Sequence, residues 1–409
     1  MANKFSMNRR NFLGTAGTVT ALSTLPNIMP ASVLGANDRI LMGIIGSGGR
    51  GRGVMRDFMG FDAKFIAVCD VFEPNLQAGL EMAGEGAKGY KDFRKLVEVK
   101  EIDAVLIGSC EHQHAPHLIA TVEAGKDSYC EKPMSHSIEE GVKMVKAVRN
   151  TDRIVQVGMQ RRSSPAVHEA KNTVIDQGWL GNIYMVKAIW NWNYSSKLNN
   201  SPLGGELDWE AFCYPARVSE FEPMKYRYWR YFWDFSGGNC TDQGTHLMDV
   251  IQWFMSSAKK RDQVTPLSAE CFGGVYKMEG AETPDIFTAL FDYGDFMATW
   301  TLNYTNRYHD GWEIIFQGDQ GTLVLDDRGS RFYKDPNPGN KPDWEFEGPL
   351  PTVPHVENFL ECMKSRKEPN APVEVGHTAV SGPHLANVAW HHRKRAYMNR
   401  EATEVRLEA

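Results

Sequence analysis

The fold of this chain is decided by one stretch near its start, Ile40-Leu41-Met42-Gly43-Ile44-Ile45-Gly46-Ser47-Gly48-Gly49-Arg50-Gly51. The apolar first half predicts a buried strand, and we expect a helix after the glycines. Gly46 and Gly48 permit a tight turn and the close approach of a pyrophosphate, and Gly51 lets the helix pack on the strand. The helix N-terminus offers free N–H groups and a positive dipole end to phosphates. The stretch therefore predicts a dinucleotide-binding turn, with a purely structural turn as the alternative; the predicted contacts are Gly46, Gly48, Gly49, Arg50 and Gly51.

A second apolar run, residues 65–69, ends at Asp70. Its spacing from the glycines is about that at which an acidic residue meets the adenosine ribose in dinucleotide-binding folds. A carboxylate there accepts hydrogen bonds from a 2′-hydroxyl and repels a 2′-phosphate. Asp70 therefore favours NAD over NADP as the cofactor.

Short apolar runs alternate with helical segments from residue 40 to about residue 160, which is typical of βαβ units and a parallel sheet. The pattern predicts a nucleotide-binding domain over residues 37–160. Its expected strands are 40–45, 65–69, 103–108, 127–130 and 154–158, and its expected helices are 74–82, 90–97, 115–124 and 138–150.

The pattern of apolar runs and helical segments changes in the second half of the chain. The new pattern predicts an α+β domain over residues 161–409 with a mostly antiparallel sheet. The whole chain is thus expected to be an α/β protein of two domains with a cleft between them. The expected strands are 183–192, 269–276, 285–291, 297–304, 312–317 and 322–326, and the expected helices are 165–177, 241–255, 355–365 and 376–395.

Charge and cysteine content exclude several classes of protein. The net charge of -6 and the lack of a basic stripe argue against a nucleic-acid partner. The seven cysteines show no CxxC spacing, so neither a zinc site nor a disulfide framework is expected. Three of them, Cys69, Cys110 and Cys130, end apolar runs and are expected to be buried.

Residues 1–36 are predicted to be a twin-arginine signal peptide. Arg9-Arg10 precedes a weakly apolar stretch with too much Gly and Thr for a stable transmembrane helix. We therefore expect export to the periplasm with no membrane anchor afterwards, and cleavage near Ala36. A frayed cytosolic N-terminus is the alternative.

Two motifs carry candidate chemistry. Lys132 follows an expected strand at the carboxyl edge of the sheet, where an ammonium can stabilise a developing alkoxide; a surface lysine is the alternative. Asp242, His246 and Asp249 are spaced i, i+4 and i+7 behind a predicted N-cap at Thr241, so they share a helical face. A carboxylate beside an imidazole raises its basicity. The alternatives are a histidine satisfied in the core and a cation site, and no second cluster supports a metal.

These motifs together resemble the Gfo/Idh/MocA family of oxidoreductases. The resemblance rests on the glycine turn, the run from Asp103 to His114, Ala124-Gly125-Lys126, Glu131-Lys132-Pro133 and Asp242-x-x-x-His246. It implies a Rossmann domain followed by a domain with an open sheet that often forms the oligomer interface. It further implies that Lys132, Asp242 and His246 are catalytic and that His114 and Glu131 lie at the cofactor.

The family resemblance implies oxidation or reduction of a secondary hydroxyl of a sugar or polyol. We expect hydride transfer from a sugar or glycoside to tightly bound NAD, with a 3-keto sugar as one product. A redox-neutral NAD-dependent glycosidase that works through a keto sugar is the alternative, and a scaffold without catalysis is a third.

Substrate choice is expected to depend on the aromatic-rich segment 190–235, because aromatic faces stack on the C–H faces of sugar rings. Packing within the core or between subunits is the alternative role of these aromatics. The predicted substrate contacts are Gln160, Arg161, Trp192, Arg230, Asp242 and His246.

Overall fold

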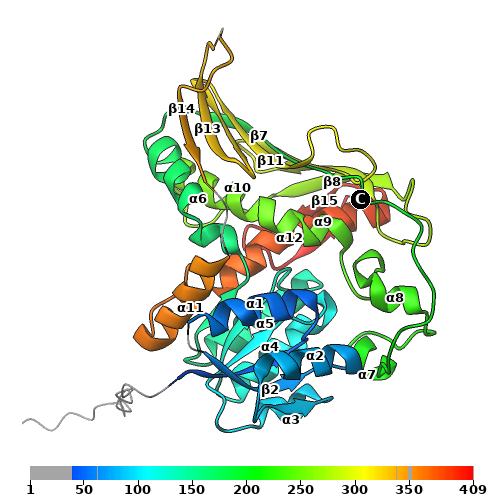
Figure 1. The fold of residues 1–409 in the computed structure, drawn as a ribbon. Helices are drawn as coiled ribbons and strands as arrows, with labels where there is room; N and C mark the ends of the chain where they lie inside the picture. Colours follow the sequence, from blue (N-terminus) through cyan, green and yellow to red (C-terminus); the bar gives the residue numbers. More distant parts are fainter. Residues whose placement is uncertain (1–38, 62, 338, 349–351, 409) are drawn as a thin grey trace, which may run out of the picture. The chain divides into compact units, whose positions relative to one another are not determined.

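A parallel sheet of six strands, in the order β3-β2-β1-β4-β5-β6, forms around the first apolar stretch (Figure 1). The computed structural model describes residues 39–61, 63–337, 339–348 and 352–408, so the predicted signal peptide lies outside the described residues. The expected strands of this sheet are all present, and β3 is additional. Their bounds are β1 Leu41–Ile45, β2 Lys64–Cys69, β3 Lys88–Tyr90, β4 Ala104–Ile107, β5 Asp127–Cys130 and β6 Val155–Val157.

Helices cover both faces of this sheet, as the almost wholly apolar strands require. In β1, Ile45 belongs to a core shared with α3, α4 and α5, whereas Ile44 faces α1 and the later helix α11. The helices are α1 Gly49–Met59, α2 Glu73–Ala83, α3 Phe93–Val97, α4 His114–Glu123, α5 Ile138–Arg149 and α11 Val353–Ser365.

The expected helix 90–97 is wrong in its first turn. Tyr90 ends the short strand β3, which pairs with β2, and the helix begins only at Phe93. Asp92 caps that helix by accepting a hydrogen bond from the Arg94 N–H at 3.0 Å.

A second sheet of ten strands has the order β14-β13-β12-β11-β7-β10-β9-β8-β15-β16. Its strands pair antiparallel except for β7 and β10, which are parallel, so the expected mostly antiparallel sheet is confirmed. The strands β13 to β16 were not expected from the sequence. The bounds are β7 Ile183–Asn191, β8 Ser268–Gly274, β9 Ile286–Asp292, β10 Met297–Asn303, β11 Gly311–Gly318, β12 Gly321–Asp326, β13 Gly329–Lys334, β14 Trp344–Glu347, β15 Ala396–Met398 and β16 Val405–Leu407.

Buried and less buried residues alternate along the second sheet, and helices lie on one of its faces (Figure 1). The covering helices include α10 Gly244–Lys259 and α12 Val373–His392, whose apolar residues share one core with the strands. The expected helix 165–177 is α6 Pro165–Ala170 followed by a π-helical turn, η3 Lys171–Ile175.

The expected helix 241–255 is two helices. The short α9, Gly238–Asp242, ends before Gln243, and α10 starts at Gly244. Thr241 lies inside α9 and donates its hydroxyl to the Gly238 carbonyl oxygen at 3.1 Å, so the prediction of an N-cap at Thr241 is wrong.

The C-terminal helices return to the first sheet. Phe359 of α11 contacts Phe58 of α1 with ring centroids 5.9 Å apart, and Gln156 of β6 donates to the His355 carbonyl oxygen at 2.6 Å.

The predicted division into two domains at residue 160 stays a prediction. None of the described helices combines the length and the apolar character that a membrane span requires.

Candidate active site

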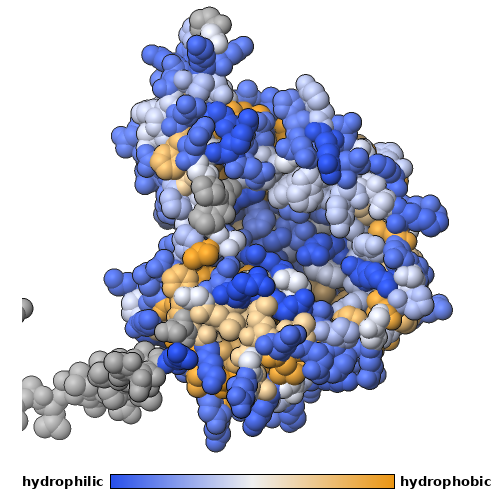
Figure 2. Space-filling model, in the orientation of Figure 1, coloured by the Kyte–Doolittle hydropathy of each residue, from blue (hydrophilic) through white to orange (hydrophobic). Residues whose placement is uncertain are grey.

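A cavity of about 1030 Å³ lies at the carboxyl edge of the first sheet. Its wall is formed by the loops that follow β1, β2, β4 and β5 and by parts of the segment 192–243. The space-filling view shows this face of the molecule hollowed and mostly hydrophilic (Figure 2). The volume is at the upper end of the range for small-molecule sites, about 300–1,000 Å³.

The glycine turn after β1 has the shape that a pyrophosphate requires. Gly46 has a φ of +85°, and a Cβ atom there would lie 2.4 Å from the Ser109 nitrogen. A Cβ atom on Gly51 would lie 2.1 Å from the Gly46 oxygen. At Gly48 and Gly49, by contrast, a Cβ atom would meet no atom closer than 3.8 Å, and both residues line the cavity. The open space lies at the start of α1, where free N–H groups favour a phosphate.

Asp70 follows β2 and lines the cavity beside this turn. Its Oδ2 accepts a hydrogen bond from the Ser47 N–H at 2.8 Å, and its Oδ1 accepts one from the Phe72 N–H at 2.9 Å. Burial raises the pKa of Asp70 to about 6, against the lowering effect of these hydrogen bonds. The carboxylate is thus fixed in place with lone pairs left for ribose hydroxyls, which fits an NAD site.

The adenosine end of the cavity is crossed by a segment of the second half of the chain, residues 195–228, which we call the strap. It contains the short helices α7 Trp209–Cys213 and α8 Pro223–Arg227. The strap joins the first sheet's loops through backbone hydrogen bonds from Glu73 N–H to the Glu206 oxygen and from Asp208 N–H to the Val71 oxygen, both at 2.9 Å.

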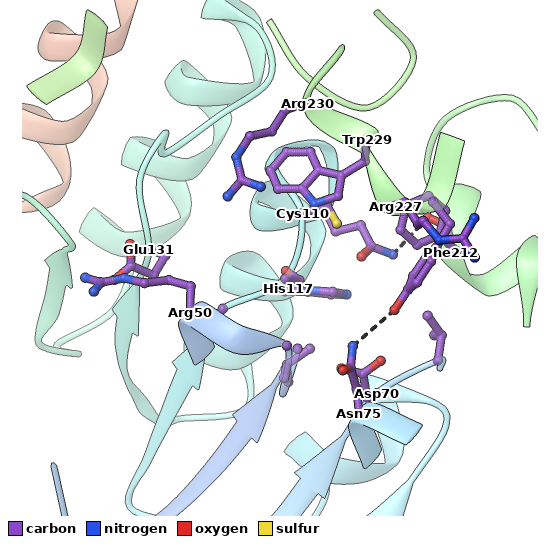
Figure 3. Close-up of a pocket in the computed structure, with 18 of the residues that line it drawn as sticks. Arg50, Asp70, Asn75, Cys110, His117, Glu131, Phe212, Arg227, Trp229 and Arg230 are labelled. Carbon is purple, nitrogen blue, oxygen red and sulfur yellow. Dashed lines mark hydrogen bonds and ion pairs between the residues drawn. The ribbon is translucent and has the colours of Figure 1, made fainter. Parts of the chain in front are cut away.

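Side-chain contacts also join the strap to the loops of the first sheet. The Asn75 amide donates to the Tyr226 hydroxyl at 3.1 Å, and Figure 3 draws this bond as a dashed line from Asn75. The rings of Phe72 and Tyr226 lie 4.9 Å apart. The Gln113 amide donates to the carbonyl oxygens of Ala211 and Phe212 at 3.1 and 3.2 Å. Much of the aromatic segment expected at the substrate therefore packs over the nucleotide end of the cavity.

The other end of the cavity holds Lys132 and Asp242. Lys132 Nζ donates to the Asp242 carbonyl oxygen at 2.9 Å and to its Oδ1 at 2.8 Å. Arg230 Nε lies 3.3 Å from the other carboxylate oxygen. Burial raises the pKa of Asp242, but the two cations outweigh it and lower the pKa to about 2. Asp242 is therefore an anion that orients Lys132.

His246 is not paired with Asp242, and this corrects the prediction of a carboxylate–imidazole dyad. The Asp242 carboxylate is taken by Lys132 and Arg230 instead. The Nδ1 atom of His246 is buried without a hydrogen-bond partner among the described residues. Burial and the nearby charges of Lys132 and Arg161 lower its pKa well below the usual range, so the ring is neutral at pH 7.

The predicted cofactor residues Arg50 and Glu131 lie side by side in the cavity wall and contact one another (Figure 3). Arg50 Nη2 lies 2.8 Å from Glu131 Oε1, and the Gln160 amide donates to the same oxygen at 3.3 Å. Glu131 Oε2 is buried, and no described residue hydrogen-bonds to it. Arg50 and Glu131 line the cavity, but Gln160, Arg161 and His246 do not, so their contact with a substrate stays a prediction.

His114 does not reach the cavity, which corrects its predicted role as a cofactor ligand. The ring is fully buried, and its two nitrogens contact the carbonyl oxygens of Pro133 at 2.6 Å and Ser109 at 3.0 Å. His114 thus braces the loop that carries Lys132. Trp192 and Arg230, predicted substrate contacts, do line the cavity, together with Tyr194, Asn239, Gln243 and Tyr304, which the sequence did not single out.

Glu111 is a further residue that the sequence did not single out. It is wholly buried after β4, and its Oε2 accepts hydrogen bonds from Ser236 Oγ at 2.6 Å, Gly237 N–H at 3.2 Å and Thr241 Oγ1 at 3.2 Å. It therefore ties the first sheet to α9, which carries Asp242. Burial raises the pKa of Glu111 to about 8.

Two family models match the chain. The oxidoreductase family model with the NAD-binding Rossmann fold matches residues 40–159, and the GFO/IDH/MocA C-terminal domain model matches residues 168–324. The matches together cover more than half of the chain. The chain belongs to the Gfo/Idh/MocA family of oxidoreductases. Its first domain is the NAD-binding Rossmann domain of that family, in agreement with the geometry of the glycine turn and Asp70.

Curated relatives match mainly the nucleotide-binding part. Inositol 2-dehydrogenase of Salmonella typhimurium is 33% identical over 122 residues, which are 30% of this chain and 36% of that protein. The rhizopine catabolism protein MocA of Rhizobium meliloti is 24% identical over 257 residues, which are 63% of this chain and 68% of that protein. The match to the inositol dehydrogenase thus spans little more than a third of that protein's length.

Solved structures share the fold over most of the chain. The WlbA dehydrogenase of Bordetella pertussis, in complex with NADH and UDP-GlcNAcA, has a TM-score of 0.67 at 20% identity and covers 88% of this chain and 99% of its own. Levoglucosan dehydrogenase, in complex with NADH and L-sorbose, has a TM-score of 0.70 at 16% identity and covers 89% of this chain and 100% of its own.

Within the described residues, no group of three or more His, Cys, Asp or Glu side chains could hold a metal ion.

Proposed function

We propose that this protein is an NAD-dependent oxidoreductase that acts on a secondary hydroxyl of a sugar or glycoside. One observation carries the proposal. A single cavity contains the glycine turn and Asp70 at one end and Lys132, fixed by Asp242, at the other. Dehydrogenases of this family fold are found in complex with NADH and sugars or sugar nucleotides, and their names support this substrate class.

The chain's own residues account for the movement of the proton. When bound, NAD supplies the hydride acceptor, carbon 4 of the nicotinamide. Two of the three Nζ hydrogens of Lys132 are directed to Asp242, which leaves one for the reacting hydroxyl and for the alkoxide that develops as the hydride leaves. We propose that the hydroxyl proton passes to His246, which is neutral. Because His246 does not line the cavity, this transfer requires that substrate binding brings the hydroxyl to the imidazole ring. The substrate loses one hydride and one proton and becomes a ketone.

Tight retention of NAD is part of the proposal. The strap crosses the adenosine end of the cavity and is fixed by hydrogen bonds at Glu73, Asp208 and Tyr226. A nucleotide bound beneath it would leave only after those contacts opened. This accords with the twin-arginine pattern at Arg9-Arg10, which favours export of the folded protein, with its cofactor already bound, to the periplasm.

A homo-oligomer through the second sheet completes the proposal. Large apolar side chains are exposed on its strands or directly after them, with Tyr184 57%, Phe272 66%, Tyr276 69% and Met297 47% exposed. Large exposed apolar side chains at several positions of one open sheet support a partner surface there.

The test is a nucleotide analysis of the purified protein followed by a screen of sugars, inositols and aryl glycosides. Formation of NADH and a keto sugar is the expected result, and the position of the ketone identifies the hydroxyl. Release of the aglycone without net redox change would show the glycosidase instead. Protein that binds NAD but turns over no compound in the screen would contradict the dehydrogenase activity.

A further inference from the structure

The reacting end of the cavity holds one more cationic side chain than anionic ones. Arg50 is paired with Glu131, but Lys132 and Arg230 share the single carboxylate of Asp242. All five side chains line the same cavity. When a ligand fills the cavity and displaces its water, a cation left without a counter-ion is costly. The imbalance therefore favours a ligand that brings one negative charge to this end.

Arg230 is the cation with unused hydrogen-bonding capacity. Only its Nε contacts Asp242, at 3.3 Å, and neither Nη atom has a partner among the residues that the structure describes. The side chain is 41% exposed, and it projects over Trp229, 4.3 Å from the ring centroid, into the cavity (Figure 3). The free edge of a guanidinium group matches the two oxygens of a carboxylate.

We propose that Arg230 binds a carboxylate of the substrate, and that the substrates are therefore sugar acids, such as hexuronic acids or their glycosides. This inference rests on the proposed function, because it names the substrate class of the same site. Lys132 and Arg230 bind the two oxygens of one carboxylate, so their free donors lie close together. The acid group is accordingly carried on the same sugar ring as the hydroxyl that reacts at Lys132. One surplus positive charge matches a carboxylate better than a doubly charged phosphate ester.

The experiment compares acid and neutral sugars in matched pairs with the NAD-loaded enzyme. The pairs are methyl glucuronides with methyl glucosides and methyl galacturonides with methyl galactosides, as both anomers. We expect kcat/KM to be at least tenfold higher for the acid in at least one pair. In Arg230→Gln this ratio should fall at least tenfold, and Arg230→Lys, which keeps the charge, should retain part of it.

Arg227→Gln is the matched control for the ratio. Arg227 lines the same cavity, but its Nη atoms donate to the carbonyl oxygens of Ser201 and Pro202. Its replacement should change acid and neutral sugars by the same factor. A ratio that falls equally in Arg227→Gln would overturn the assignment to Arg230.

Other outcomes separate this inference from the proposed function. Equal or better use of the neutral sugar in every pair overturns the inference and leaves the dehydrogenase intact. If no sugar is turned over, the proposed function fails, and calorimetry of glucuronate with the NADH-loaded protein decides the inference. Glucuronate binding that becomes tenfold weaker in Arg230→Gln supports the inference. An absence of glucuronate binding overturns the inference. A tenfold loss of NADH affinity in Arg230→Gln would assign Arg230 to the cofactor and also overturn it.

Discussion

At the scale of single residues, Lys132 and His246 should be needed for chemistry more than for folding. Lys132→Ala leaves Arg230 to neutralise Asp242, and His246→Ala removes no hydrogen bond from Nδ1, so the unfolding temperature should change little. Each variant should nevertheless lower turnover by roughly 10²-fold, the scale of lost acid–base assistance. Steady-state kinetics and thermal unfolding measure the two effects. Lys95→Ala, at an exposed residue that is paired with Glu98 and lies outside the cavity lining, is the control. Turnover within a few-fold of the unchanged protein would remove that residue from the mechanism.

Asp70 should make cofactor choice depend on pH. Its pKa of about 6 leaves it ionised at pH 8, where it repels a 2′-phosphate, and mostly protonated at pH 5. The preference for NADH over NADPH should therefore be largest at pH 8 and should shrink as the pH falls through 6. Asp70→Ser combined with Val71→Arg should relax the preference at every pH. Fluorescence titration of nucleotide-free protein provides the dissociation constants, and equal affinities at pH 8 would refute the role of Asp70.

Local motifs explain which site residues could be predicted from the sequence. Gly46, Asp70 and Lys132 each follow a strand within a few residues, so their place at one sheet edge follows from the βαβ pattern alone. The pairing of Lys132 with Asp242 and that of Glu111 with Ser236 could not be predicted, because each joins residues more than one hundred positions apart. The i, i+4 spacing of Asp242 and His246 also does not reveal competing cations, and Lys132 and Arg230 occupy the Asp242 carboxylate.

At the scale of the element, Glu111 should make the docking of α9 sensitive to pH. Its folded pKa of about 8 is above the ordinary value of 4.5, so the folded state binds the proton more tightly than the unfolded state. Its contribution to stability is thus full below pH 4.5 and declines as the pH rises to 8, by at most about 1.4 kcal/mol per pH unit. Glu111→Gln should remove this decline while the amide oxygen still accepts hydrogen bonds.

Denaturant unfolding at pH 6 and pH 8 measures the effect of Glu111. The loss of stability between the two pH values should be smaller in Glu111→Gln than in the unchanged protein. Glu98→Gln, on the exposed side of the first domain, should show the unchanged loss. An identical pH dependence in Glu111→Gln would show that the Glu111 carboxyl is ionised throughout this range.

The aromatic-rich segment shows where composition alone misleads. Its density of rings predicted a sugar platform, and Trp192 does line the cavity. Many of its rings instead form a separate core with Phe212, Phe232 and Phe235, which supports the strap. The sequence shows that such rings must pack on some apolar surface. Only the tertiary fold reveals that this surface includes residues of the first domain. The strands β13 to β16 escaped prediction because they extend the two ends of a sheet that the rest of the chain must first build.

At the scale of the whole molecule, the strap connects the two halves of the chain over the nucleotide. Its backbone contacts at Val71 and Glu73 and its side-chain contact at Asn75 all lie directly after Asp70, the residue expected at the ribose. Release of the nucleotide therefore requires local opening of the strap, and this opening must break the hydrogen bonds and ring packing that hold the strap, which costs free energy. The proposed retention of NAD therefore depends on the strap as well as on the glycine turn.

NAD should therefore remain with the protein through purification and extensive dialysis. Nucleotide analysis of the denatured protein should find about one NAD(H) per chain, and a chase with unlabelled NAD should exchange the bound nucleotide slowly. Tyr226→Ala removes both the hydrogen bond from Asn75 and the ring contact with Phe72, so it should speed this exchange at least tenfold. Tyr276→Ala, which removes an exposed ring outside the cavity wall, should leave the exchange rate unchanged. A protein that emerges empty and needs millimolar NAD would contradict retention. It would also remove the main physical argument for export with the cofactor in place, because an enzyme outside the cytosol must keep the nucleotide it carries.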